Sequence, residues 1–353
     1  MSHPLFEELQ QVHTGMFVAE NHSLSNYNTL HLGGNAELFA IATKQSELFD
    51  LLKFLHNHPE LPFTILGSGS NVVISDAGLP GLTIVNKANK IDIHPRIHEP
   101  DSNFKVTYAQ RNENEPQKYL DFTRLDYDES HLPYQEVTIQ AGTPLPFAIT
   151  QLISAGLTGL QWFGYIPGTV GGAVYQNIHG GSYHFSDYTD TIKVFNLKTG
   201  KTELLKKDKL NWKYETSMFQ KNPHLIVLSV TLKLFRGDTN KAMEVYKAWI
   251  AQKSKVQSMA SPGSAFANPS LEICQKIWGE QKSTGWIIDH ELSLKGFSIG
   301  GAKISNEHSN FFINTGTATA ADFYNLVKYV QDMVREKFGF ELIPEIKFLG
   351  KFN

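Results

Sequence analysis

The chain has 353 residues, of which 41% are hydrophobic and 19% charged, so it can bury the core of two or three domains and is not disordered by composition. Its formal net charge of -3 leaves no basic excess, which argues against nucleic acid as a partner. The single cysteine, Cys274, excludes an intramolecular disulfide and a thiolate metal cluster. Because the N-terminal sequence lacks the features of a secretory signal, and no apolar run approaches the roughly 18 residues of a membrane span, we expect a cytoplasmic protein.

The first predicted elements are a helix, two short strands and a glycine-rich loop between the strands. Apolar residues with helical spacing predict a helix over residues 46–55, and β-rich runs predict strands over 63–66 and 72–75. The segment from Gly67 to Asn71 connects these strands. Because a strand follows this loop where a Rossmann fold would place a helix, the pattern disfavours a Rossmann fold.

The middle of the chain combines a polar segment with a second glycine-rich loop. Residues from about 95 to 133 are polar and mixed in charge, which predicts a surface excursion such as a long hairpin. Apolar periodicity then predicts a helix over residues 148–155 and a strand over 225–235. The second loop, from Pro167 to Gly172, lies between these two elements.

A domain boundary is expected near Gly237, after the predicted strand. Beyond it, residues 241–252 have a helical pattern, and a capping box with a terminal glycine predicts a longer helix over 319–338. Alternation over residues 340–349 predicts a terminal strand. The C-terminal part therefore combines α and β structure.

The two glycine-rich loops are candidate phosphate-binding segments. Glycines leave backbone amides unhindered, so each loop offers a nest for phosphate oxygens. One such loop is more often a tight turn between strands. Two loops beside strands suit a dinucleotide whose pyrophosphate is held from both sides, and two unrelated turns are the alternative.

Eight short motifs occur in the same order as in a known enzyme family. They are Asn28-Thr29 with Leu32 to Ala36, Ile65 to Asn71, Ile166 to Ala173, Gly263-Ser264 with Asn268-Pro269, Gly285 to Asp289, Leu294 to Gly296, Ile299 to Ala302, and Pro344-Glu345. Each motif is common by itself, but all of them in register argue against chance. The chain resembles the UDP-N-acetylenolpyruvoylglucosamine reductase (MurB) family over nearly its whole length.

The resemblance implies an α+β fold, in which an FAD-binding domain of the vanillyl-alcohol-oxidase (PCMH) type accompanies a smaller α+β substrate-binding domain. Residues 1–237 would form the FAD-binding region, with two lobes divided near residue 90 and the polar insertion at about 95–133. Residues 238–353 would bind substrate and return their terminal strand to the flavin. The implied reaction is NADPH-dependent, FAD-mediated reduction of UDP-N-acetylglucosamine enolpyruvate to UDP-N-acetylmuramate in peptidoglycan precursor synthesis, by a monomer without a metal.

The resemblance also implies roles for individual residues. Ser264 would protonate the enol intermediate, and Glu345 would assist protonation or stabilise that intermediate. A hydroxyl is a poor acid in water, so Ser264 needs a dry site and a neighbouring cation or ordered water. The substrate would contact Tyr214, Lys255 and Asn268. The residues implied in FAD binding are Gly67, Ser68, Gly69, Ser70, Asn71, Gly168, Thr169, Gly171 and Gly172.

One position departs from the family pattern. The family's Tyr-Arg-x-Ser-x-Phe motif reads here from Tyr214 to Phe219, with Glu215 where an arginine is expected to pair with the substrate carboxylate. Because an ionised glutamate there opposes the charge that develops on the substrate, we expect a lysine to compensate. The candidates are Lys213, Lys253 and Lys255, and strand alternation would place Lys213 on the same side as Glu215.

The charge reversal keeps two other functions open. One is a flavin oxidase of the same superfamily, although such an enzyme has no need of Gly263-Ser264 or Pro344-Glu345. The other is a non-catalytic protein that binds a UDP-sugar. His179 and His184 are interpreted as ordinary histidines, because no carboxylate or cysteine completes a recognised zinc spacing around them.

Overall fold

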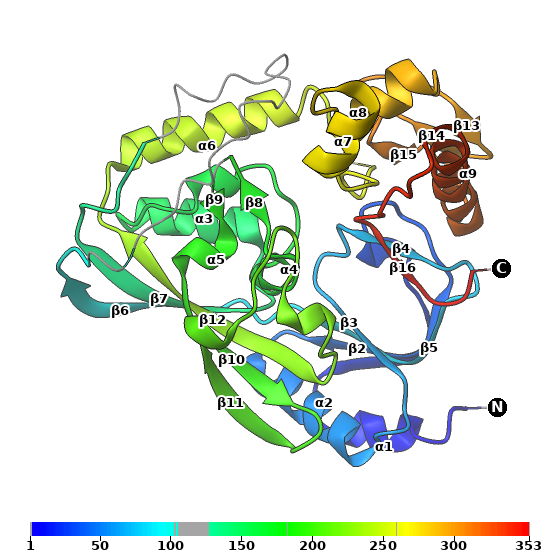
Figure 1. Ribbon diagram of the computed structural model, residues 1–353. Helices are drawn as coiled ribbons and strands as arrows, with labels where there is room; N and C mark the ends of the chain where they lie inside the picture. Colours follow the sequence, from blue (N-terminus) through cyan, green and yellow to red (C-terminus); the bar gives the residue numbers. More distant parts are fainter. Residues whose placement is uncertain (1, 102–103, 105–126, 182, 259, 353) are drawn as a thin grey trace.

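The computed structural model describes residues 2–101, 104, 127–181, 183–258 and 260–352. Three groups of elements follow one another along the chain: an N-terminal lobe, a central lobe around a five-stranded sheet, and a C-terminal lobe around a long helix (Figure 1). Within the described residues, no helix combines the length and apolar character of a membrane span.

The N-terminal lobe is a four-stranded sheet in the order β1-β2-β5-β3, with helix α2 packed on it. Strands β2 and β3 both run parallel to β5, whereas β1 is antiparallel to β2. The predicted helix and both predicted strands are confirmed. The elements are α1 (Phe6–Gln11), β1 (Phe17–Ser23), η1 (Ser25–Tyr27), β2 (Asn35–Ala42), α2 (Gln45–Asn57), β3 (Phe63–Leu66), β4 (Val72–Ile74) and β5 (Leu79–Asn86).

The central lobe contains an antiparallel sheet in the order β11-β10-β12-β7-β6. The predicted strand over 225–235 is confirmed as β12, and the helix predicted over 148–155 is confirmed as α3. The elements are β6 (Ile91–His98), β7 (Tyr134–Gln140), α3 (Leu145–Ser154), η2 (Gln161–Phe163), α4 (Val170–Gln176), β8 (His179–Gly180), β9 (Tyr183–His184), α5 (Phe185–Tyr188), β10 (Thr189–Asn196), β11 (Lys201–Lys206), η3 (Lys207–Lys209), η4 (Met218–Gln220), β12 (Leu225–Phe235) and α6 (Thr239–Lys253).

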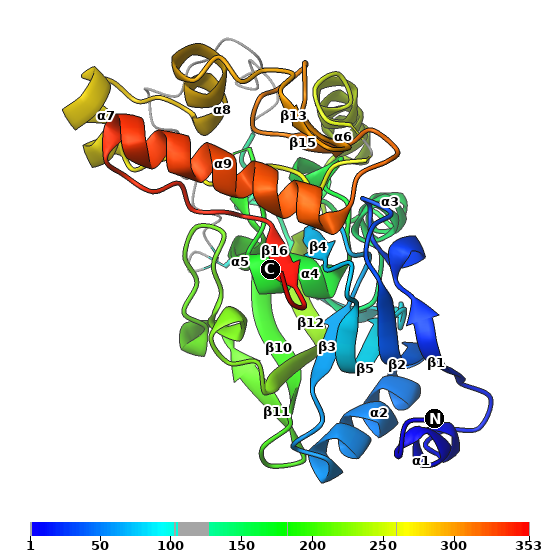
Figure 2. The same ribbon diagram turned by 90° about the vertical axis from the view of Figure 1, so that its right-hand side faces the viewer.

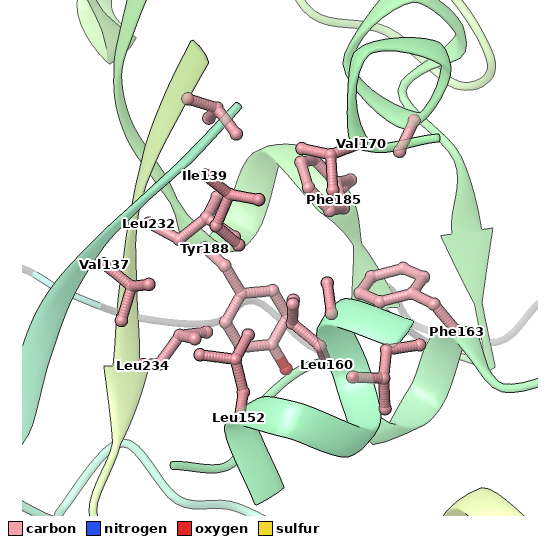
Figure 3. Close-up of a cluster of buried hydrophobic side chains, with 14 of the residues drawn as sticks. Val137, Ile139, Leu152, Leu160, Phe163, Val170, Phe185, Tyr188, Leu232 and Leu234 are labelled. Atoms are coloured by element: carbon pink, nitrogen blue, oxygen red, sulfur yellow. The ribbon is translucent and has the colours of Figure 1, made fainter. Parts of the chain in front are cut away.

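A large apolar core fills the space between this sheet and its helices. Leu232 and Leu234 of β12 face Leu152 of α3, with Phe163 and Tyr188 beside them, and all five side chains are buried (Figure 3). Burying one such side chain contributes roughly 1.5–3 kcal/mol. Helix α6 packs on the same core. The core includes Val170, Ala173 and Val174, so it supports the second glycine-rich segment.

The predicted polar excursion joins two paired strands. Strands β6 and β7 are antiparallel neighbours, as a hairpin requires, while residues 102–103 and 105–126 of the excursion lie outside the described residues. Glu129, inside the excursion, is buried, which a solvated surface segment does not explain. Its carboxylate accepts hydrogen bonds from Thr158 Oγ1 at 2.6 Å and Gln161 Nε2 at 3.0 Å, and these bonds offset part of the cost of burial.

The second glycine-rich segment is only partly a loop, so the prediction needs correction. Helix α4 begins at Val170, which places Gly171 and Gly172 in its first turn. Thr169 is the N-cap, and its side chain accepts a hydrogen bond from the amide of Gly172. The capping threonine overrides the low helix propensity of the two glycines.

The C-terminal lobe places a three-stranded sheet and several short helices around α9. The helix predicted over 319–338 is confirmed with its caps, since Thr319 and Asp322 form the capping box and Gly339 ends the helix at a φ of 75°. The elements are α7 (Leu271–Trp278), α8 (Thr284–Trp286), η5 (Ile287–Glu291), β13 (Ser298–Ile299), β14 (Ala302–Ile304), β15 (Phe312–Asn314), α9 (Ala320–Phe338) and β16 (Lys347–Leu349).

The terminal strand is shorter than predicted. Only Lys347–Leu349 is a strand, and it pairs in parallel with β4 of the N-terminal lobe (Figure 2). Pro344 lacks a backbone N–H, and it and Glu345 instead form an extended segment that contacts residues 265–266. The chain thereby returns to the first glycine-rich loop.

Candidate active site

The two glycine-rich segments lie in contact. Ser70 Oγ donates a hydrogen bond to the Pro167 carbonyl oxygen at 3.3 Å, and an added Cβ on Gly67 would lie 2.4 Å from Thr169 Oγ1. Outside the regular helices and strands, none of the backbone–backbone hydrogen bonds among the described residues is donated by the amides of residues 68–71. These amides fit a ligand rich in acceptor oxygens, such as a pyrophosphate.

The glycines in these segments serve different purposes. Gly69 has a φ of +62°, and a Cβ there would lie 2.1 Å from the Tyr27 carbonyl oxygen. A Cβ on Gly171 would press on Ala141 at 2.9 Å. Gly172 faces open space, because the nearest atom to its Cβ position is Thr169 Oγ1 at 3.7 Å. Close backbone packing thus requires Gly69 and Gly171, whereas the open side of Gly172 leaves room for a ligand.

Glu215 lies in a tight turn and not on a strand. Lys213 and Thr216 exchange two backbone hydrogen bonds of 3.0 and 3.1 Å, and Glu215 adopts a φ of 48° between them. Asn177 Nδ2 donates to the Lys213 carbonyl oxygen at 2.8 Å and fixes the turn to the end of α4. The strand alternation that was expected to place Lys213 beside Glu215 is therefore wrong, and Lys213 is exposed.

The turn brings Glu215 to Glu345. The two carboxyl groups form a hydrogen bond, in which the protonated group donates to the ionised one. Burial, together with the hydrogen bond to Glu215 and its negative charge, raises the pKa of Glu345. Burial also opposes ionisation of Glu215, but hydrogen bonds with His179 and Glu345 and the charges of His179 and Lys253 outweigh it and lower its pKa. At neutral pH the pair of carboxyl groups therefore holds one proton, and that proton resides on Glu345.

His179 completes this cluster from the opposite side. Its Nδ1 lies 3.1 Å from Glu215 Oε1, with the two side chains 36% and 24% exposed. Its Nε2 lies 3.4 Å from the hydroxyl of Tyr214, which is itself exposed. His179 was interpreted as an ordinary histidine, and the structure adds to that interpretation its contacts with Glu215 and Tyr214. Neither spacing nor periodicity pairs this residue of β8 with the turn around Glu215, and only its place just after a glycine motif hinted at the site.

Of the three candidate lysines, Lys253 is the one whose charge is seen to lower the pKa of Glu215. It is the last residue of α6, and burial lowers the pKa of its amine while the charge of Glu215 opposes that effect. Lys255 is exposed and lines a cavity of about 260 Å³ with Ser305 and Asn306. The structure thus brings together Lys253, Glu215 and Glu345 and places Lys255 at that cavity.

Ser264 and Asn268 lie on the segment beside Glu345. The Glu345 amide donates a hydrogen bond to the Ala265 carbonyl oxygen at 3.0 Å, so Ser264 immediately precedes the residue that binds Glu345. Gly263, with a φ of +90°, has no atom within 4 Å of its Cβ position. Asn268 Oδ1 accepts a hydrogen bond from the Thr284 amide at 2.9 Å, so the side-chain oxygen of Asn268 already has a partner within the protein.

Asn71 joins this segment to the first glycine-rich loop. Its Nδ2 donates to the Glu345 carbonyl oxygen at 3.2 Å, and its own carbonyl oxygen accepts a bond from the Lys347 amide at 3.0 Å. The candidate phosphate-binding loop therefore lies directly beside the segment that carries Glu345.

Two family models match the chain. The model described as the UDP-N-acetylenolpyruvoylglucosamine reductase C-terminal domain matches residues 253–349, and the model of an FAD binding domain matches residues 112–206. These matches and the solved structure below confirm the predicted α+β fold with an FAD-binding domain.

Individual relatives cover nearly the whole chain. The UDP-N-acetylenolpyruvoylglucosamine reductase of Acaryochloris marina is 32% identical over 94% of this chain and 92% of its own, and that of Anoxybacillus flavithermus is 29% identical over 98% and 99%. The crystal structure of MurB from Thermus caldophilus is similar with a TM-score of 0.66 and 26% identity, over 95% of this chain and 99% of that one. The chain belongs to the UDP-N-acetylenolpyruvoylglucosamine reductase family.

Proposed function

We propose that this protein catalyses the NADPH-dependent reduction of UDP-N-acetylglucosamine enolpyruvate to UDP-N-acetylmuramate, a step of peptidoglycan precursor synthesis. Membership of the reductase family supports the reaction, and the match to an FAD binding domain supports FAD as the cofactor. The observation that carries the proposal is the position of Glu345, a carboxyl group with a raised pKa, beside the segment that holds Ser264. Reduction of a carbon–carbon double bond requires such a proton source next to the hydride donor.

FAD would be held by the amides of residues 67–71 and by the segment from Gly168 to Gly172, including Ser68 and Ser70. When bound, FAD supplies the chemistry that accepts a hydride from NADPH and delivers it to the enolpyruvyl double bond. The open side of Gly172 and the uncommitted loop amides fit such a ligand. Asn71 ties this cradle to Glu345, so the fold holds the cofactor segment and the acid in one geometry.

Ser264 and Glu345 would supply the proton. Hydride addition leaves negative charge on the enolic part of the substrate, and a positioned hydroxyl or carboxylic acid lowers the barrier by delivering a proton to carbon. Lys253 would take the place of the family's arginine toward the substrate carboxylate, because its charge already acts on Glu215. Tyr214, Lys255 and Asn268 would contact the UDP-sugar.

Cofactor binding and substrate binding are assigned to different parts of the chain. Residues 1–237 would bind the cofactor and residues 238–353 the substrate, with α6 as the connection that packs on the central core. We also propose a cytoplasmic monomer, which agrees with a free, buried Cys274 and a nucleotide-linked substrate.

One preparation tests the function. The visible spectrum of the purified protein reports bound flavin, and NADPH absorbance is then followed with and without the enolpyruvyl UDP-sugar. Flavin bands with substrate-dependent NADPH oxidation are expected. Flavin with oxygen-dependent oxidation of an alcohol would instead identify an oxidase. Flavin without turnover would identify the non-catalytic UDP-sugar binder that the charge of Glu215 keeps open.

A further inference from the structure

The proposed reaction consumes one proton from solvent in every turnover, because a hydride and a proton add across the double bond while NADPH supplies only the hydride. Glu345 is only partly exposed and forms a hydrogen bond with Glu215, so a neighbouring ionisable group can supply the proton that replaces the one it has given up. Three ionisable side chains from separate parts of the chain form a continuous line between Glu345 and the surface. They are Glu345 on the C-terminal segment, Glu215 in its turn and His179 on β8.

We propose that His179 and Glu215 are positioning residues of a proton relay that returns a proton to Glu345 after each turnover. This inference rests on the proposed function, in which Glu345 is the acid. Nothing in the family resemblance assigns it, since the relay uses the glutamate that replaces the expected arginine.

The geometry supports each link of the relay. His179 Nδ1 lies 3.1 Å from Glu215 Oε1, and the Glu215 carboxyl group forms a hydrogen bond with Glu345. The imidazole is 36% exposed, against 24% for the side chain of Glu215, and its Nε2 lies 3.4 Å from the hydroxyl of Tyr214, a residue that is 56% exposed. A proton that enters at His179 therefore needs two short transfers to reach Glu345.

The proton balance of one cycle is closed. Loss of the proton from Glu345 leaves two adjacent carboxylates, whose mutual repulsion raises their proton affinity. The His179 imidazolium then gives its Nδ1 proton to Glu215, and Glu215 passes a proton to Glu345. Neutral His179 keeps its Nε2 proton, so its partly exposed ring turns to present Nδ1 to solvent, takes up one proton there and turns back, which restores the starting state. No bond other than O–H and N–H bonds changes in the relay.

Other charged groups lie around the relay and affect the proton affinities of its members. Lys347 acts on Glu345, Lys253 acts on Glu215, and His184 faces His179 with ring centroids 6.3 Å apart. Asp187 acts on His184 and raises the pKa of that ring against the larger effect of its burial. The two lysines stabilise the carboxylates and limit the rise in proton affinity during the cycle.

The first test needs neither cofactor nor turnover. Infrared spectra of the cofactor-free protein are recorded against pH for the wild type, Glu345→Gln and Glu215→Gln. A protonated carboxyl band at neutral pH that is absent in Glu345→Gln is assigned to Glu345. In Glu215→Gln we expect that band to titrate at lower pH, because the neighbouring negative charge is gone. An unchanged titration would overturn the coupling between the two carboxyl groups.

The second test separates the relay from the acid itself. In His179→Gln holoenzyme we expect a single turnover within about twofold of wild type, while steady-state turnover falls by about tenfold or more and is restored by added imidazole. The matched controls are His94→Gln and Glu136→Gln, because His94 and Glu136 form a similar pair at 3.4 Å, 35% and 30% exposed, on β6 and β7. Both controls should behave as wild type.

The outcomes distinguish the relay from the function on which it rests. Full steady-state turnover of His179→Gln without a response to imidazole, alongside an inactive Glu345→Gln, would overturn the relay and leave the acid in place. Wild-type single turnover of Glu345→Gln would overturn the role of Glu345 as the acid. His179→Asn serves as a second variant at this half-exposed position, so a folding defect of one substitution does not decide the result.

Discussion

At the scale of single residues, the charge of Glu215 changes what its neighbours must do. A second buried carboxylate would be costly next to Glu345, and the structure avoids that cost by keeping one proton in the pair. The hydrogen bond with His179 and the charge of Lys253 then favour the ionised form of Glu215. In the proposed reaction, an arginine at this position would pair with the substrate carboxylate, whereas Glu215 would act on the substrate through Glu345.

Gly172 is a position at which a substitution should affect flavin binding without affecting folding. A side chain there meets no protein atom closer than 3.7 Å, so we expect Gly172→Leu to fold normally and to lose its flavin absorbance because the side chain enters the cofactor space. Gly172→Ala should raise the free energy of unfolding by about 0.5–1 kcal/mol, since alanine is the better helix former. Circular dichroism and visible spectra measure both effects.

Gly69→Val is the contrasting variant for this test. Its Cβ would lie 2.1 Å from the Tyr27 carbonyl oxygen, so loss of flavin there should accompany loss of structure. Folded Gly172→Leu with a full complement of flavin would contradict the cofactor position.

Lys253 is the residue on which substrate affinity should depend. We expect Lys253→Met to raise the KM for the enolpyruvyl substrate at least about tenfold, because a charge-assisted hydrogen bond to a carboxylate contributes roughly 1.5–3 kcal/mol. Lys213→Met is the matched control, since Lys213 is exposed at the turn that carries Glu215. Equal KM values for the two variants would reject Lys253 as the partner of the substrate carboxylate.

The carboxyl pair should also set a pH dependence of stability. The pKa of Glu345 is raised in the folded state, so above its ordinary value near 4.5 the unfolded chain releases a proton that the folded chain keeps. The contribution of Glu345 to the free energy of unfolding therefore falls as pH rises, by at most about 1.4 kcal/mol per pH unit.

Glu345→Gln should remove this contribution, because an amide does not titrate and can still donate a hydrogen bond to Glu215. Urea unfolding of the cofactor-free proteins between pH 5 and 8 measures the difference. We expect the stability of the variant relative to wild type to increase with pH. Parallel curves would show that Glu345 ionises normally in the folded protein.

At the scale of elements, long periodic segments were predictable and short ones were not. The apolar spacing of α2 and α9 and the alternation of β12 each span enough residues to outweigh local exceptions. Helix α4 was missed because its seven residues include two glycines, and its start depends on the side chain of Thr169. Strand β16 depends on pairing with β4, which the sequence does not encode locally.

The residues of the candidate site were likewise predictable only where they occur in short motifs. Motifs indicated Ser264, Glu345 and the glycine-rich segments, because those residues occur in short recognisable strings. The contact between Glu215 and His179 depends on a left-handed turn, with a φ of 48° at Glu215, and on the bond from Asn177 that places it. Such a turn at a glutamate has no sequence signature, since glycine or asparagine is the usual residue there.

The cap of α9 offers a test at the same scale. Thr319 accepts a hydrogen bond from the Asp322 amide at 3.1 Å, and Asp322 accepts one from the Thr319 amide at 2.9 Å. Thr319→Ala should therefore lower the free energy of unfolding by about 1 kcal/mol. Thr317→Ala, at an exposed position just before the cap, is the control and should change it little. Equal unfolding midpoints for the two variants would show that the cap contributes nothing measurable.

At the scale of the whole molecule, the C-terminal segment joins parts that are far apart in sequence. Leu30, Leu32 and Val73 of the N-terminal lobe belong to the same buried cluster as α9. Strand β16 adds backbone hydrogen bonds to this contact, including one from the Ser75 amide to the Leu349 carbonyl oxygen at 2.8 Å. The position of Glu345 relative to the first glycine-rich loop therefore depends on a connection made by the last residues of the chain.

Removal of residues 347–353 tests this dependence. The truncated chain keeps Glu345 and all the residues implied in flavin binding, but it loses the bond from the Lys347 amide to Asn71 and the pairing of β16 with β4. We expect its melting temperature and its flavin content to fall together, because the same strand orders the loop and closes the lobes. Lys351→Ala is the control, since Lys351 accepts the bond from Ser75 Oγ through its backbone oxygen, which the substitution retains. If the truncated protein melted at a lower temperature yet kept its flavin, β16 would contribute stability alone, and the loop would hold its conformation through the contacts with Tyr27 and Thr169.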